Sequence, residues 1–137
     1  MRGNTQTVRW PPPCATFALL MTPETYRLIH VLGLIVLLLG LGGVLATAGP
    51  GQKPNRVFLM LHGLGALAVL VGGIGFAHKS GLGMPAWVWT KLGGWLVLGA
   101  MPTLVGRGLM PRGAALIVVL AIGAAAAWLG VAVTKPF

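Results

Sequence analysis

The side chains with useful chemistry in this sequence are few: three histidines, one lysine and one glutamate, within or beside long apolar segments. They are Glu24, His30, His62, His78 and Lys91. Imidazole nitrogens ligate haem iron and other metals, so the three histidines are candidate metal ligands. Glu24 is the only acidic residue and Cys14 the only cysteine. Because paired carboxylates, a Ser-His-acid set and a CxxC motif are all missing, we identify no catalytic residue.

Composition places these residues in a membrane protein. The 137 residues are 56% hydrophobic and 8% charged, with a mean hydropathy of +0.88. Segments long enough to cross a bilayer are expected near 27–47, 57–77, 87–105 and 114–133. The connections TAGPGQKPN, KSGLGMP and RGLMPR are short, so consecutive helices run antiparallel. We predict an all-α integral membrane protein, a four-helix antiparallel transmembrane bundle over residues 21–137.

The first 20 residues do not fit a span, because PPP interrupts them. We expect residues 1–20 to form an N-terminal extension, either disordered or interfacial, and Met21 is an alternative start. The first helix is expected to begin with Thr22 as its N-cap, Pro23 at the first helical position and Glu24 in the first turn.

The depth of each histidine follows from a rise of about 1.5 Å per helical residue. His30 and His78 come to the same side of the membrane, where they could hold a haem iron between them. Alternatively, both histidines lie at the membrane interface and form hydrogen bonds with head groups, water or backbone carbonyls. His62 lies near the opposite face at a depth similar to Met101, so a His62–Met101 ligand pair competes with a role for Met101 as core filler.

Lys91 stands one turn inside the third span, in the segment AWVWTKLGGW at 86–95. Its stem can reach the membrane interface, where Trp87 and Trp89 are expected with Trp95 in a one-sided aromatic belt. Glu24 is the only carboxylate at that level. We therefore predict a structural Glu24–Lys91 pair between the first and third helices, with binding of a substrate or haem propionate as the alternative role of Lys91.

Small residues are expected to let the helices approach closely, because packing in lipid depends on close backbone contact. The residues expected at such contacts are Gly40, Gly72, Gly73, Gly93, Gly94, Gly123, Ala127 and Gly130. The Ala-rich run GAAAAWLG at 123–130 is the expected place for a partner protein.

The basic residues give a net charge of +9, which in a soluble protein would indicate nucleic acid. Here they stand singly at the ends of apolar segments, so we expect the lipid bilayer, and no nucleic acid, as their partner. Six lie on the N-terminal side and four on the other, which favours cytoplasmic termini; a start at Met21 makes the count equal. The first group is Arg2, Arg9, Arg27, Lys79, Lys91 and Lys135, and the second is Lys53, Arg56, Arg107 and Arg112.

Three segments resemble a known group of proteins: YRLIHVLGLIVLLLGLGG in the first span, RVFLMLHGLG in the second and WVWTKLGGWLVL at the start of the third. They are similar to the small helical membrane proteins typified by the HemJ-type protoporphyrinogen oxidase, with its copper-resistance and SirB2-like relatives. The resemblance implies a b-haem protein in which His30 is a haem ligand and Lys91 a functional cation. The basic residue usual near the end of the first helix is replaced here by LGGVLATAG.

The missing catalytic set, minimal loops and abundant small residues predict a non-enzymatic accessory or assembly subunit that packs against a larger complex in the bacterial inner membrane. One alternative is a b-haem redox protein or porphyrin-handling oxidase built on His30, His78 and Lys91. Another is a homo-oligomeric channel or carrier, for which the spans offer almost no polar lining.

Overall fold

The computed structural model describes residues 22–47 and 53–133 of the chain. Within them it contains four α-helices and no strand: α2 Pro23–Thr47, α3 Arg56–Lys79, α4 Ala86–Gly106 and α5 Arg112–Val133. All four are long and apolar enough to cross a membrane. The prediction of a four-helix transmembrane bundle is confirmed. The expected extension 1–20 lies outside the described residues.

The predicted start of the first helix is also confirmed. The backbone N–H of Thr25 donates to Thr22 Oγ1 at 3.3 Å, and α2 begins at Pro23 with Glu24 in its first turn. This N-cap satisfies one of the four N–H groups that the first turn of a helix leaves without an internal partner. The helix therefore starts a turn earlier than the residue 27 expected from hydropathy alone.

The end of α4 is set by a glycine in a left-handed conformation. Gly108 has a φ of +70°, and the N–H of Leu109 donates to Leu104 O at 2.9 Å while the N–H of Gly108 donates to Val105 O at 3.0 Å. Helix α3 ends in the same manner at Gly81, with a φ of +66°. Glycine suits both positions because a side chain would be strained there.

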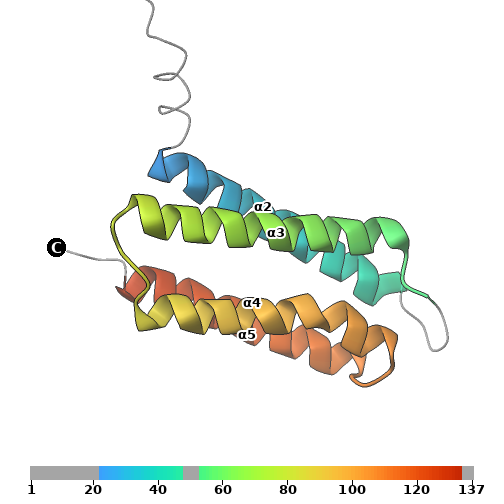
Figure 1. Cartoon of the computed structure of the whole chain (residues 1–137). Helices are drawn as coiled ribbons and strands as arrows, with labels where there is room; N and C mark the ends of the chain where they lie inside the picture. The colour runs from blue at the N-terminus through green and yellow to red at the C-terminus, as the bar shows by residue number, and fades with distance from the viewer. Residues whose placement is uncertain (1–21, 48–52, 134–137) are drawn as a thin grey trace, which may run out of the picture.

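The closest contact in the bundle is between α2 and α3, which lie side by side in Figure 1. Glycines bring the two backbones together: Gly40 faces His62, Gly65 faces Leu37 and Gly72 faces His30. A Cβ added to Gly72 would lie 2.5 Å from the backbone nitrogen of His30, and Cβ atoms at the other two glycines would meet the opposite backbone more closely still. Helices can approach this closely only where one of them has no side chain.

Helix α4 joins this pair through apolar side chains and one hydrogen bond. Met101 is fully buried against Leu41 and Val44 of α2, and the indole N–H of Trp95 donates to Ala66 O of α3 at 2.9 Å. Trp95 was expected in the interfacial belt, and this expectation was wrong. It stands nine residues into α4, about 13 Å along the helix, where its N–H needs a protein acceptor because lipid offers none.

The small residues of α4 and α5 make fewer contacts than expected. A Cβ at Gly94 would lie 3.0 Å from Ile122, but one at Gly93 or Gly123 would meet nothing within 4 Å, and Ala127 is exposed. Adjacent residues of a helix point in directions about 100° apart. Because Gly94 and Ile122 face each other, their neighbours Gly93 and Gly123 point away from this contact. Within the described residues, these two glycines are therefore not helix contacts.

The α2–α3 contact makes different predictions for neighbouring glycines. Gly40→Ala should lower the free energy of unfolding by about 3 kcal/mol, because its Cβ overlaps the His62 backbone and the helices must separate. Gly42→Ala adds a Cβ that meets nothing within 4 Å and should raise stability by up to about 1 kcal/mol through helix propensity. Thermal unfolding in detergent measures both, and equal effects would contradict the interface.

Candidate functional site

His30 lies at the α2–α3 contact, half-buried, with its ring against Gly73 of α3. Its Nδ1 is 2.8 Å from the backbone oxygen of Val69. Because a carbonyl oxygen only accepts, Nδ1 is the donor in this hydrogen bond. The hydrogen bond connects α2 to α3, which gives His30 a structural use.

His62 is the one buried polar side chain among the described residues, with 5% of its surface exposed. Its Nδ1 lies 3.3 Å from Leu37 O, so this nitrogen also donates to a carbonyl of α2. Its Nε2 is buried with no hydrogen-bond partner. An imidazole whose Nδ1 donates to a carbonyl and whose Nε2 has no hydrogen-bond partner has the form of a metal ligand, since ligating histidines usually donate their other ring N–H to a carbonyl or carboxylate.

The structure places His62 and Met101 at a similar depth, as expected. Trp95 of α4 bonds to Ala66 of α3 and marks a common level of the two helices. His62 precedes Ala66 by four residues and Met101 follows Trp95 by six. Because α3 and α4 are antiparallel, both lie on the same side of this level, at about 6 and 9 Å from it. Met101, however, belongs to a closed apolar cluster with Leu41 and is 0% exposed. It fills the core, and no gap for a flat cofactor separates it from α2.

His30 and His78 are not brought together. His30 lies opposite Gly72, whereas His78 is exposed six residues farther along α3, an axial offset of about 9 Å. A porphyrin held between two imidazoles also needs space between the helices that carry them, and α2 and α3 touch backbone to backbone at this level. The described residues therefore do not fit a haem with His30 and His78 as its axial ligands.

Lys91 takes a different partner from the one predicted. Its Nζ lies over the ring of Trp87, 5.1 Å from the centroid, and a Cβ added to Gly130 of α5 would lie 3.4 Å from it. No described carboxylate lies within 4.0 Å of a Lys or Arg nitrogen, so the Glu24–Lys91 pair is not formed. Trp87 precedes Lys91 by four residues and shares its helix face, so the ring is the nearer partner.

The described residues contain no group of three His, Cys, Asp or Glu side chains that could hold a metal ion. The candidate site thus reduces to one buried histidine, His62, and one half-buried cation, Lys91. The sequence offered a backbone carbonyl as one alternative partner of His30, but it did not identify Val69 O, and it gave no sign of the bond from His62 to Leu37 O. Sequence reasoning also missed Trp87 as the partner of Lys91, although their spacing of four residues was available.

These features define a helical integral membrane protein whose polar groups lie mainly at helix contacts. Comparison with models of protein families, with curated proteins and with solved structures finds no match. The resemblance to the b-haem group stays an expectation based on the three quoted segments.

His62→Leu tests whether the buried imidazole has a purely structural role. Leucine has a similar volume and leaves no unpartnered nitrogen, whose burial costs about 1–3 kcal/mol. We expect the variant to be about 1 kcal/mol more stable in thermal unfolding, even after loss of the bond to Leu37 O, while His78→Leu at an exposed position should change little. A clear loss of stability would show that His62 contributes more than the contacts described.

The visible absorption spectrum tests the haem alternative directly. Protein produced with ample haem should show no Soret band after purification, because His30 and His78 do not form an axial pair. A band in the wild type that disappears in His30→Ala but persists in His78→Ala would overturn this expectation and identify His30 as a ligand.

Proposed function

We propose that the protein is a non-enzymatic accessory or assembly subunit of the bacterial inner membrane, with both termini in the cytoplasm. It packs against a larger membrane protein through α5. The observation that carries this proposal is the uncovered surface of α5. This helix is the least buried of the four spans, and within the described residues its main contact is with α4.

The small residues of α5 support the location of the partner surface. Gly123 and Ala127 are both exposed, four residues apart on one face of the helix. In lipid, such a pair permits another helix to approach closely, as the glycines of α2 and α3 do within this chain. A helix that displays this pair to the outside has a surface suited to a partner helix.

The scarcity of buried polar and metal-ligating side chains among the described residues favours a subunit over an enzyme or a carrier. Among the described residues, the buried polar side chains reduce to His62, and no cluster of metal-ligating groups is present. A conduction path needs a polar lining or coordinating carbonyls, and the core clusters around Leu37 and Leu41 are apolar. These observations support packing as the main activity of the chain.

Purification from native membranes in mild detergent tests the proposal. The wild type should co-purify with a membrane protein in constant ratio, and Gly123→Leu should lose it, because the leucine prevents close approach to α5. Gly63→Leu is the matched control: Gly63 is exposed with nothing within 4 Å, but Leu59 and Leu67 flank it on the same face. A wild-type protein that always migrates alone, or equal losses in the two variants, would refute the proposal.

A further inference from the structure

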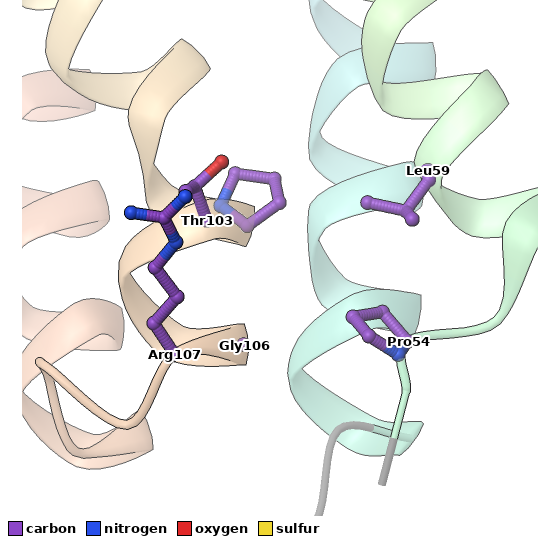
Figure 2. A pocket seen from close by; sticks show the side chains of 6 residues that line it. Pro54, Leu59, Thr103, Gly106 and Arg107 are labelled. Atoms are coloured by element: carbon purple, nitrogen blue, oxygen red, sulfur yellow. The ribbon is translucent and has the colours of Figure 1, made fainter.

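A pocket of about 240 Å³ lies between the start of α3 and the end of α4, and none of its lining residues belongs to α5. Figure 2 shows Pro54 and Leu59 on one wall and Thr103, Gly106 and Arg107 on the other. Pro102 completes the lining. The pocket is largely open, and its walls are apolar except for the hydroxyl of Thr103 and the guanidinium of Arg107.

The direction of the Arg107 side chain makes this cation unusual. Helical side chains lean toward the N-terminus of their helix, so an arginine at the C-terminal end of a span leans into the membrane. In Figure 2 the side chain runs back along α4, and the guanidinium lies beside Thr103, one turn inside the helix. By the same rule Arg56 and Arg112, which begin α3 and α5, lean outward to water.

No carboxylate of a side chain in this protein can neutralise Arg107. The sequence has one acidic residue, Glu24, which begins α2 at the other surface of the bundle, about 30 Å away across the hydrocarbon core. At the surface that carries Arg107, the other ionic side chains of the described residues are Lys53, Arg56 and Arg112, all basic. The helix C-terminus supplies only a partial negative charge to Arg107.

We propose that the α3–α4 pocket binds one anionic phospholipid, with its phosphate on the Arg107 guanidinium and an acyl chain along Leu59 and Pro102. A phospholipid matches both parts of the pocket, because it has an anionic group at the interface and an apolar chain that enters the membrane beside it. Basic pockets between transmembrane helices are suited to such head groups. The site is separate from α5, so it does not depend on the proposed partner.

The test is native mass spectrometry of the full chain in mild detergent, with phosphatidylglycerol and phosphatidylcholine added in equal amounts. The wild type should retain phosphatidylglycerol preferentially. Arg107→Gln should weaken this retention about fivefold, the factor that corresponds to one cation at an anionic lipid surface. Arg112→Gln removes the same charge from the same surface outside the pocket and should retain the lipid nearly as well as the wild type.

A second pair of variants tests the pocket without changing charge. Gly106→Leu should displace the lipid, because the side chain extends from a Cβ position only 3.5 Å from Pro54 Cγ. Gly113→Leu, where nothing lies within 4 Å, should not, and circular dichroism checks that both variants remain helical. Three outcomes would overturn the proposal: equal retention of the two lipids, equal effects of Arg107→Gln and Arg112→Gln, or displacement of the bound lipid by inorganic phosphate, which would indicate a site for the free anion.

Discussion

The bundle depends on how closely α2 and α3 approach each other. In a bilayer the lipid is as apolar as the helix surface, so burying leucine gains little and close contact must come from shape. Gly40, Gly65 and Gly72 provide that shape, since each receives the backbone of the opposite helix. The contact also fixes the register of the pair, because a shift of either helix by one residue would place a side chain where a glycine is needed.

This register determines how the polar groups inside the membrane are satisfied. His30 and His62 each lie near a carbonyl of the opposite helix, and Trp95 bonds from α4 to α3. All three use the second lone pair of a carbonyl that already belongs to a helix. These hydrogen bonds are directional, so they favour one orientation of helices whose surfaces are otherwise apolar. Among the described residues, the buried side-chain nitrogen left without a hydrogen-bond partner is Nε2 of His62.

The spans and the first N-cap were predictable from the sequence, because hydropathy and capping are local properties. The rotation of each helix about its axis was not. An apolar helix in apolar surroundings has no polar face to mark its outside, so the difference between Gly93, which has no close neighbour, and Gly94, which contacts Ile122, cannot be read from composition. For the same reason the depths of His30, His62 and Lys91 could be estimated, whereas the carbonyls and the indole ring that they meet could not. Charge complementarity pointed to Glu24 for Lys91, but the ring of Trp87 was closer.

The closeness of the α2–α3 pair also bears on the order in which the bundle forms in the membrane. The two helices are joined by a short connection and precede α4 and α5 in the chain, so their contact requires little loop closure and neither of the helices that follow. Their hairpin can therefore close before α4 and α5 are inserted, and it presents the carbonyl of Ala66 and the apolar surface around Leu37 as a template for α4. Helix α5 follows α4 in the chain and is held chiefly by it. Of the four described helices it is therefore the one most free to exchange contacts within the chain for contacts with another protein.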